Sequence, residues 1–582
     1  MKNYMNLKKV NKIIYRTHNC GELRKKDLGK EVILSGWIQK IRNLGSLFFI
    51  DIRDYFGITQ LIISKKQVKK NFLLGKEFLI KVKGKVVERL SKNYNIPTGE
   101  IEILVSYINL INSSLSPPFT IEDKTDGNEE MRMIYRYLDI RRNPIKNNLI
   151  IRHNLVLEIR NFFSKNGFLE IETPILINDT PEGARSFIVP SRTHINKFYA
   201  LAQSPQLFKQ LLMIGGIDKY FQIIKCFRDE DSRSNRQIEF TQIDCEMSFV
   251  EVHDILIFFE HFIKHIFQKI KNIQLDPFPC ISYSNAIKMY GTDSPDIRFG
   301  MDFVELNDLV QRKDINVLKT QELVIGIKVK ECKNLQQNKM DCFLKKIENK
   351  NFFWIKYLYD QTFLFSNSIF LNEEIIKIFV KYFEAIPGDL LFFSYGKKRK
   401  TREELGKIRV KIADILNLKD SKTFTPLWIK DFPLLEWDKI LKKYKSVHHP
   451  FTSPKEEDLH LLEKKPKNVR TKSYDLIING IEIGSGSIRI HNKNIQNLIF
   501  KHLGFSKKEI ESRFGFFIKA FEYGVPPHGG IAFGLDRLIN LLERDQNIKN
   551  FIAFPKNNYG KDLMINAPSF LEKEKLKELH FR

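Results

Sequence analysis

"CFRDEDSRSNRQIEFTQIDCEMSF", residues Cys226–Phe249, is a heavily charged segment between two apolar runs, "KYFQIIK" and "FVEVHDILIFF". In its second half, alternation with a period of two places Phe240, Asp244 and Glu246 on one face and apolar side chains on the other. A solvent-facing antiparallel sheet alternates in the same way, but a surface row rarely combines a large aromatic ring with carboxylates. Because arginine binds phosphate through two parallel hydrogen bonds and phenylalanine can stack on a purine, we predict that this hairpin binds a nucleotide.

A second segment, "GGIAFGLDRLINLL" at Gly529–Leu542, reads as a short apolar strand, a glycine and an amphipathic helix with Arg537 in its first turn. A helix N-terminus beside an arginine favours an anion. A surface arginine without a ligand is the common alternative for any one such residue.

"YDLIINGIEIGSGSIRIH", Tyr474–His491, contains the best hairpin signal of the chain, the Asn-Gly pair at 479–480. A two-residue turn there places Asp475 and Glu482 on the same face as diagonal neighbours. Two carboxylates so close repel each other unless a cation lies between them, and Mg²⁺ carried by phosphates is the natural occupant. Simple alternation sends Arg489 to the opposite face, so we expect a bulge at one of the glycines of "GSG" to restore it.

"AQSPQLFKQLL", Ala202–Leu212, predicts a helix with Ser204 as its N-cap and a proline at its first position. Gln206 and Lys209 then lie one turn apart on a polar stripe, with leucines behind it. A lone lysine on a helix is usually solvated, so this one is of interest only because of the other motifs.

The region from about residue 29 to 111 reads as five short strands rich in β-branched and aromatic residues, which predicts a small barrel such as the oligonucleotide-binding type. In "SLFFIDIRD", Phe48, Ile50 and Ile52 share one face, and Phe49 lies on the other among charged residues. An aromatic exposed in this way can stack on a base. The alternative is an edge aromatic beneath a neighbouring loop.

The bulk composition limits the class of protein. A chain of 582 residues is too long for one hydrophobic core, so we expect several domains. The formal net charge of +26 favours a polyanionic partner, nucleic acid first and an anionic membrane second. Lys, Asn, Ile and Phe are abundant throughout, a pattern that also arises in a genome rich in A and T. The positive charge would then reflect the genome and would not indicate a partner.

Six cysteines lie far apart without a C-x-x-C pair, which indicates neither a disulfide framework nor a zinc site. No uninterrupted apolar run approaches the length that spans a bilayer, and the N-terminus has no apolar stretch of signal-peptide length. We therefore expect a cytoplasmic protein that does not use a membrane.

Taken together, these segments resemble the class II aminoacyl-tRNA synthetases, and in detail the bacterial branch that uses aspartate. "GFLEIETPIL" is similar to the first motif of that class, "CFRDED" with "RQIEFTQID" to the second, and "GIAFGLDRL" to the third. "TPEGARSF", "QSPQLFKQL", "HHPFTSP" and "GSGSIRIH" are more specific, since the lysine and asparagine enzymes read differently there. The resemblance runs from about residue 15 to 569 and is weak only in an insertion that is itself typical of the bacterial enzymes.

The resemblance implies an α+β fold: a five-stranded OB-type barrel, a class II catalytic domain with an antiparallel sheet flanked by helices, and an inserted α/β domain. It implies a barrel that binds the anticodon at 1–118 (1–14 being an extension) and a hinge at 119–148. The catalytic domain is expected at 149–300 and 421–582, with the insertion at 301–420. A homodimer is also implied.

The resemblance further implies ATP, L-aspartate and tRNA(Asp) as substrates and Mg²⁺ as cofactor. The residues expected to bind aspartate are Glu182, Gln206, Lys209, Arg228, Asp244, His448 and Arg489. Those expected to bind ATP are Arg228, Asp229, Glu230, Gln237, Phe240, Glu482, Gly534, Leu535, Asp536 and Arg537. The expected metal ligands are Asp475 and Glu482, and the expected catalytic groups are Arg228, Glu482 and Arg537. The expected anticodon readers are Arg42, Phe49, Gln60 and Glu102.

The implied mechanism is a two-step acyl transfer. The aspartate carboxylate attacks the α-phosphorus of ATP, pyrophosphate leaves, and the 3′-terminal hydroxyl of the tRNA then attacks the mixed anhydride. No side-chain nucleophile is required, so positioning and charge stabilisation should carry the catalysis.

The sequence departs from the class at Ile238, where proline is usual, so we expect a looser hairpin tip. An asparaginyl or lysyl enzyme is the nearest rival, and Arg489 with Lys209 argues against it because a lysine pocket would need carboxylates there. A tRNA-binding relative without activity is a rival of another kind, and the presence of the expected ATP contacts argues against it. Whether tRNA(Asn) is also charged stays open.

Overall fold

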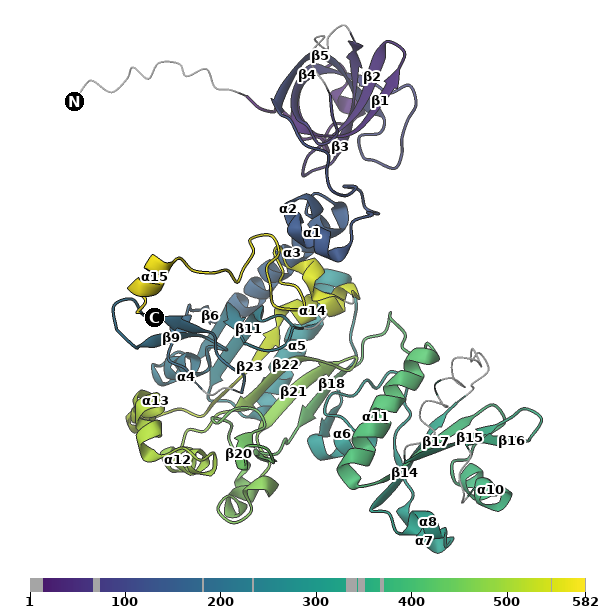
Figure 1. Ribbon diagram of the computed structural model, residues 1–582, viewed down its shortest axis with the longest axis vertical. Helices are drawn as coiled ribbons and strands as arrows, with labels where there is room; N and C mark the ends of the chain where they lie inside the picture. The colour runs from purple at the N-terminus through teal and green to yellow at the C-terminus, as the bar shows by residue number, and fades with distance from the viewer. Residues whose placement is uncertain are drawn as a thin grey trace. The chain divides into compact units, whose positions relative to one another are not determined.

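The computed structural model describes residues 14–65, 74–180, 183–232, 235–330, 343, 351–366, 371–545 and 547–580 (Figure 1). The chain divides into two compact units. The first comprises residues 1–150 with the short segments 553–557 and 561–568, and the second comprises the remainder. Glu182 falls outside the described residues.

The first unit contains a closed barrel with strand order β1-β2-β3-β5-β4. Its strands are β1 (Glu31–Leu44), β2 (Leu47–Arg53), β3 (Ile58–Ser64), β4 (Leu79–Glu88) and β5 (Ile101–Asn112). The alternation predicted in β2 is present: Ile50 and Ile52 are completely buried in the barrel core and Phe48 packs against it, while Phe49 lies on the other face, half-buried.

A short helical segment follows the barrel, with α1 (Glu129–Ile134) and α2 (Arg136–Asp139). Asp139 is completely buried and accepts hydrogen bonds from Arg136 at 2.7 Å and Arg142 at 2.6 Å. Two arginines neutralise one buried carboxylate, which fixes the local path of this segment. Helix α3 (Asn143–Lys165) then leads into the second unit.

The second unit is built on an eight-stranded sheet with the order β12-β18-β21-β22-β23-β11-β10-β6. Its strands are β6 (Leu169–Glu170), β10 (Lys219–Phe227), β11 (Glu239–Ser248), β12 (Cys280–Ser282), β18 (Pro426–Lys430), β21 (Ser473–Ile478), β22 (Ile481–Ile488) and β23 (His528–Gly534). The six central strands pair antiparallel, and only the edge strands β12 and β6 pair parallel with their neighbours.

One face of this sheet is apolar and carries the main core of the unit. Ile243, Leu476, Ile483 and Phe533 project from four strands into a cluster with α3, α5 (Val252–Lys271) and α14 (Leu535–Glu543). Period-two alternation therefore directs the intervening side chains of the same strands to the opposite face. That face holds the charged residues.

Between residues 304 and 415, the described residues include a separate five-stranded sheet with the order β13-β14-β17-β15-β16. Its strands are β13 (Val304–Glu305), β14 (Leu323–Val329), β15 (Phe352–Tyr357), β16 (Phe363–Phe365) and β17 (Leu390–Gly396), and its helices are α7 (Asn307–Arg312), α8 (Asn316–Lys319), α10 (Glu373–Tyr382) and α11 (Lys398–Ile415). All its described strand pairs are antiparallel. Apolar clusters on its two faces pack against α11 and against α7, α8 and α10.

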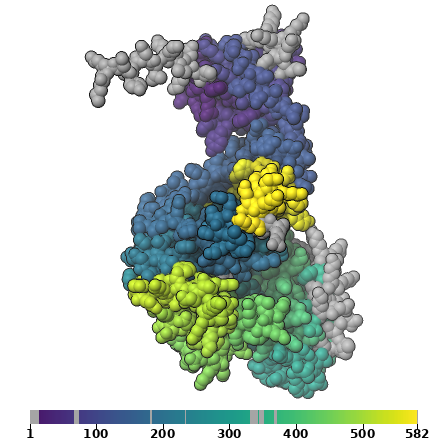
Figure 2. Space-filling view, turned by 60° about the vertical axis from the view of Figure 1, so that its left-hand side comes forward, coloured from purple at the N-terminus to yellow at the C-terminus, as the bar shows by residue number. Residues whose placement is uncertain are grey.

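The second unit contains further elements outside its two large sheets. They include β7 (Leu176–Ile177), β8 (Ile188–Pro190), β9 (Phe198–Leu201), α4 (Gln206–Ile214), α6 (Tyr283–Tyr290), β19 (Leu435–Asp438), β20 (Lys443–Ser446), α12 (Lys493–His502), α13 (Lys507–Ala520) and α15 (Lys573–Glu578). Leu207 of α4 lies in one apolar cluster with Phe500 of α12 and Phe514 of α13. Figure 2 shows the yellow-green surface, from residues near 500, adjoining the blue surface, from residues near 200. Among the described helices, we find none long and apolar enough to span a bilayer.

Candidate active site

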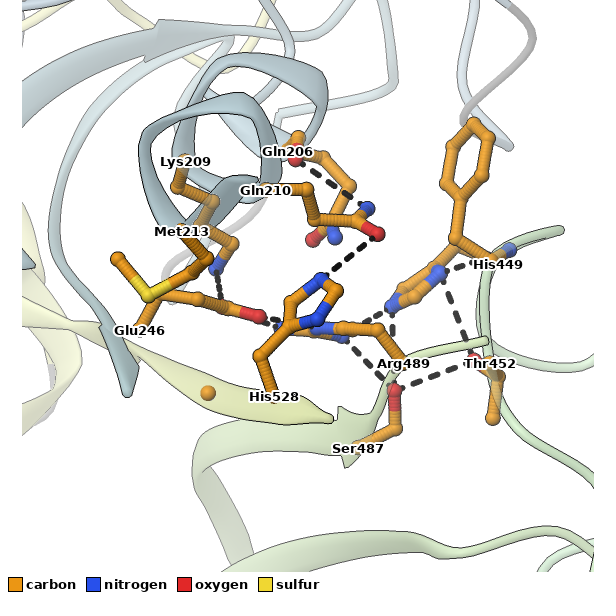
Figure 3. Close-up of polar contacts among 12 residues, drawn as sticks. Gln206, Lys209, Gln210, Met213, Glu246, His449, Thr452, Ser487, Arg489 and His528 are labelled. Carbon is orange, nitrogen blue, oxygen red and sulfur yellow. Dashed lines mark hydrogen bonds and ion pairs between the residues drawn. The ribbon is translucent and has the colours of Figure 1, made fainter. Parts of the chain in front are cut away.

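A buried cluster of opposite charges lies on the polar face of the sheet (Figure 3). Arg489 directly follows β22 and is 1% exposed; its Nε and Nη2 donate to the two oxygens of Glu246 at 2.9 and 3.0 Å. Lys209 of α4 is equally buried, and its Nζ donates to Asp244 Oδ1 at 2.7 Å and lies 3.2 Å from Glu246 Oε2. Asp244 and Glu246 are neighbours on one face of β11, which is why a single strand supplies both carboxylates.

The charges within this cluster decide the state of each group. Burial alone would raise the pKa of Glu246, but Arg489 and Lys209 hold it at about 2. Burial raises the pKa of Asp244, and the Lys209 ammonium opposes that rise. Glu246 is thus ionised and pairs with Arg489 and Lys209, whereas the pKa of Asp244 stays above its usual value.

Two polar groups of the pocket lack a partner within the described chain. Asp244 Oδ2 and Gln206 Nε2 are both buried and form no hydrogen bond there. A buried polar atom left in this state costs about 1–3 kcal/mol. One acceptor and one donor, placed beside two cations, are complementary to a small molecule that carries both an ammonium group and carboxylates.

Two adjacent histidines line the same pocket. His449 Nε2 accepts a short hydrogen bond from Arg489, and burial with the Arg489 charge lowers the pKa of His449 well below its usual value. His448 Nδ1 lies 3.2 Å from Ser485 Oγ, and burial, followed by the charge of Arg489, lowers the pKa of His448 to about 4. Both rings are therefore neutral near pH 7 and add no positive charge.

A third histidine lies behind the cluster. His528 is completely buried, and its Nδ1 donates to the carbonyl of Pro526 at 2.8 Å. Its Nε2 lies 3.3 Å from the side-chain amide of Gln210, one helical position from Lys209. Glu246, His449 and His528 were absent from the residues predicted to form the site. Only Glu246 carried a usable signal, since it shares the parity of Asp244.

The hairpin between β10 and β11 and the turn joining them carry several of the residues that were expected to bind ATP. The guanidinium carbon of Arg228 lies 5.1 Å from the centre of the Phe240 ring. Glu230 pairs with Arg236 at 2.7 Å. Gln237 is buried, whereas half of the Asp229 side chain is exposed. The structure thus brings Arg228, a group that can bind phosphate, against the Phe240 ring, a group that can stack on a purine.

In the first turn of α14, the side chain of Arg537 reaches Glu482, whereas those of Leu535 and Asp536 pack into the protein. Arg537 Nη1 donates to the carbonyl of Glu482 at 3.0 Å and lies 3.8 Å from its carboxylate. Leu535 is buried in the apolar core, and Asp536 accepts from Arg152 at 2.5 Å and from the backbone of Thr241 at 2.9 Å. The side chains of these two predicted ATP-binding residues are therefore committed to the fold, which leaves their backbone for a ligand.

The β21–β22 hairpin has the predicted Asn-Gly turn, with both residues at positive φ. Ile477 pairs with Glu482 and Leu476 with Gly484, so the extra residue is Ile483 and not a glycine. This bulge places Arg489 on the face of Glu482, as expected, although the bulge was predicted at a glycine and lies at Ile483.

The structure also corrects the predicted N-cap of α4, which is Pro205 and not Ser204.

Asp475 lies on the same face, opposite Ser485. Its Oδ1 is buried and has no hydrogen-bond partner among the described residues, and burial together with the Glu482 charge raises its pKa well above the usual value. A cation between the two carboxylates would reverse this effect. The described residues contain no group of three or more potential ligands, so a metal here would need oxygens from its substrate.

The predicted anticodon readers meet on the barrel. Arg42 donates to Gln60 Oε1 at 2.7 Å, and Gln60 donates to Glu102 Oε2 at 2.5 Å. Phe49 is the cross-strand partner of Arg42. An ordered row of polar side chains thus adjoins an aromatic ring.

Comparisons with known proteins place this arrangement in a family. Residues 128–558 match the model described as "tRNA synthetases class II (D, K and N)", and residues 32–111 match an OB-fold nucleic acid binding domain. The chain therefore belongs to the class II tRNA synthetases of the aspartate, lysine and asparagine group. The predicted α+β fold, an OB-type barrel followed by a class II catalytic domain, is confirmed. Within that family it groups with the aspartate–tRNA ligases.

Two such relatives define the similarity. The aspartate–tRNA ligase of Flavobacterium psychrophilum is 51% identical over 579 residues, covering 98% of this chain and 99% of that protein. That of Amoebophilus asiaticus is 50% identical over 574 residues, covering 97% and 99%. The solved asparaginyl-tRNA synthetase of Pyrococcus horikoshii, complexed with asparaginyl-adenylate, shares the fold alone, with 19% identity, a TM-score of 0.56 and coverage of 92% and 97%.

Proposed function

We propose that this chain activates L-aspartate with ATP to aspartyl-adenylate and pyrophosphate, and then transfers aspartate to the 3′ end of tRNA(Asp). One observation carries the proposal: Lys209 and Arg489 are buried side by side, beside an acceptor and a donor that lack partners. The cations suit the side-chain carboxylate of aspartate. Asp244 Oδ2 suits its ammonium group, with Gln206 and Glu182 as further contacts.

The first step needs the reacting groups to be aligned and their charge to be stabilised. Arg228 would hold the α-phosphate and orient the attacking carboxylate. The adenine would lie between the Phe240 ring and the Arg537 guanidinium, with Glu230, Gln237, Asp229 and the backbone of residues 534–536 around it. His448 would close over the amino acid as a neutral hydrogen-bonding group, as its lowered pKa supports.

Asparagine would be rejected by the same pocket. Glu246 and Asp244 already offset part of the positive charge. In place of the second carboxylate oxygen of aspartate, the asparagine side chain presents an NH2 group to the Lys209 and Arg489 donors, and sites that leave buried polar groups unpaired discriminate by about 10⁴-fold or more. This argument separates the proposal from an asparaginyl or lysyl activity. It also predicts that exchange of pyrophosphate into ATP depends on L-aspartate alone among the standard amino acids.

Asp475 and Glu482 fit a Mg²⁺ ion, because the buried Oδ1 of Asp475 lacks a partner and the two carboxylates repel each other. Such an ion, when bound with ATP, would neutralise charge on the departing pyrophosphate. Asp475 and Glu482 would orient it, and Arg537 would fix Glu482.

Further proposals concern the whole protein. Arg42, Phe49, Gln60 and Glu102 would read the anticodon, with the segment 119–148 as a hinge and the segment 301–420 as an inserted domain. A homodimer is supported by exposed apolar side chains near the first motif, Leu169, Leu176 and Ile188. A cytoplasmic location fits the free thiols of the described cysteines.

Aspartate-dependent ATP–pyrophosphate exchange, followed by aminoacylation of purified tRNA(Asp) and tRNA(Asn) in parallel, tests the proposal. We expect exchange with aspartate and transfer to tRNA(Asp). Exchange with asparagine or lysine instead, or tRNA binding without exchange, would refute it.

A further inference from the structure

The hairpin formed by β19 and β20 carries charge and exposed apolar surface that the proposed reaction does not use. Leu435 pairs with Ser446 at its base and Asp438 pairs with Lys443 at its far end, and its tip is the sequence "KILK" at 439–442. Resting on the function above, we propose that this hairpin binds the single-stranded 3′ end of the tRNA beside the active site. None of the residues assigned to catalysis or substrate binding lies in it.

The hairpin is strongly basic at its tip. Lys439, Lys442 and Lys443 are exposed, and within the described chain none of them forms an ion pair. Lys445, on the strand behind, is only loosely paired with Glu436 at 3.8 Å. Three uncommitted ammonium groups so close together repel one another and favour a polyanion, and tRNA is the polyanionic substrate.

The same tip also exposes large apolar side chains, which a loop that is merely solvated would not require. Ile440 is 91% exposed, Leu441 62%, and Trp437 48%. The Trp437 ring meets Tyr444 edge-on, with ring centres 5.1 Å apart, which holds the indole while leaving a large part of it open. Cations alternating with a fixed aromatic ring are the combination that binds single-stranded nucleic acid.

The hairpin is also preformed. Asp438 Oδ1 accepts hydrogen bonds from the backbone of Ile440 and Leu441, each at 2.9 Å, which shapes the turn. At the base, Glu436 accepts from Arg399 of α11 at 2.7 Å. A surface that is already ordered loses less entropy when it binds.

Chain continuity joins the base of the hairpin to the proposed aspartate pocket. β20 ends at Ser446, and His448 of the aspartate pocket is two residues further. The transfer step requires the 3′-terminal hydroxyl of the tRNA to reach the adenylate. The nucleotides that precede the 3′-terminal one must therefore pass over the residues at the border of the pocket. The base of the hairpin is joined to that border through His448.

The test reverses two tip charges, K439E/K442E, and compares them with K165E/K269E. The control lysines are exposed, form no ion pair within the described chain, and lie on α3 and α5, which pack on the apolar face of the sheet, away from the pocket. Both double variants change the net charge equally, so a loss caused by the general field of the protein would appear in both. Neither pair belongs to the machinery assigned above, and ATP–pyrophosphate exchange should be normal in both.

We expect K439E/K442E to raise the KM for tRNA(Asp) about tenfold and to lower the slope of log affinity against log salt by about 1.4, as two lost single-strand phosphate contacts would. W437A should raise the KM about fivefold or more through lost stacking, and W437F should restore it in part. The control should match the wild type.

A tRNA KM and salt slope equal to those of the control would overturn the proposal. So would a changed sedimentation coefficient without a change in tRNA KM, since the surface would then meet a second copy of the chain. Failure of the wild type to exchange pyrophosphate with aspartate would count instead against the proposed function, because exchange involves no tRNA. Direct tRNA binding, measured without catalysis, still decides the role of the hairpin in that case.

Discussion

Arg489 and Lys209 bring two positive charges into a dry site that already holds two carboxylates. A buried ion pair adds little net stability, because desolvation offsets most of the attraction, whereas removing one partner costs about 3–5 kcal/mol. The unpartnered atoms of Asp244 and Gln206 are a further cost. A cluster that is expensive to bury is explained best by a ligand that completes it.

This reasoning predicts the outcome of R489L. The variant should reduce kcat/KM for aspartate in pyrophosphate exchange about 1000-fold or more, because the side-chain carboxylate loses its main partner, while the affinity for ATP stays nearly unchanged. It should also unfold at lower temperature, since the buried Glu246 carboxylate loses its two-bond partner and keeps only Lys209, 3.2 Å away. The double variant R489L/E246L should recover thermal stability but not activity. Equal loss of ATP and aspartate affinity would show that Arg489 does not have this role.

His448 predicts a pH dependence of stability. Its folded pKa of about 4 lies below the unfolded value of about 6.5, so the unfolded chain binds more protons between these values. The free energy of unfolding therefore decreases as pH falls through that window, by at most about 3 kcal/mol from this one residue.

Urea denaturation at about pH 7, 6 and 5 checks this, and H448N should show a smaller decrease than the wild type. H153N removes an exposed histidine on α3 and should leave the decrease unchanged. An identical decrease in H448N and the wild type would rule out the contribution of His448.

At the scale of the element, the pairing of β11 with β23 explains two adjacent glycines. A Cβ at Gly530 would lie 2.0 Å from Glu246 Oε2 and 2.1 Å from the carbonyl of Cys245, whereas one at Gly529 would meet first the end of the flexible Ile488 side chain at 2.6 Å. The Glu246 carboxylate can occupy its place only because strand β23 has no side chain opposite it.

We therefore expect G530A to cost about 1–3 kcal/mol of stability and to lose aspartate activation more than ATP binding. G529A should have a smaller effect on both, since a rotamer change of Ile488 relieves the contact. Thermal unfolding and aspartate-dependent exchange, measured on both variants, separate the two. Equal effects would mean that the position of Glu246 does not matter.

The elements of the site differ in how far the sequence could predict them. Alternation along β11 was enough to assign Asp244 and Glu246 to the polar face, because side-chain parity depends on the backbone alone. The bulge of β22 was expected at a glycine but lies at Ile483, since Ile483 fills the core while Gly484 leaves room for the Phe533 ring. Only packing between strands decides that choice.

Contacts distant in the sequence were beyond prediction from the residues themselves. Arg489 and Glu246 are 243 positions apart, and His528 and Gln210 are 318 apart, so no local pattern signals either pair. The buried histidines likewise have no periodicity that marks them. The resemblance to known synthetases supplied Arg489 and Lys209, and the structure added their partners.

At the scale of the whole molecule, the net charge of +26 alone could not distinguish a tRNA-binding protein from a lysine-rich genome. The family and the barrel resolve part of that ambiguity, because a nucleic-acid-binding domain accompanies the catalytic one. Substrate activation and the nucleic-acid binding of the barrel then belong to separate parts of one chain. The two can therefore be impaired independently.

Phe49 and Phe48 allow that independence to be tested with one pair of neighbours. Phe49 lies on the outer face of β2, whereas Phe48 packs against the barrel core. F49A should raise the KM for tRNA(Asp) by about tenfold or more, as the loss of one stacked base predicts, with exchange and thermal stability nearly unchanged. F48A should instead destabilise the barrel. Two outcomes would show that Phe49 does not read the anticodon. One is an F49A enzyme that charges tRNA(Asp) normally, and the other is an F49A enzyme that rejects tRNA with an altered anticodon as well as the wild type does.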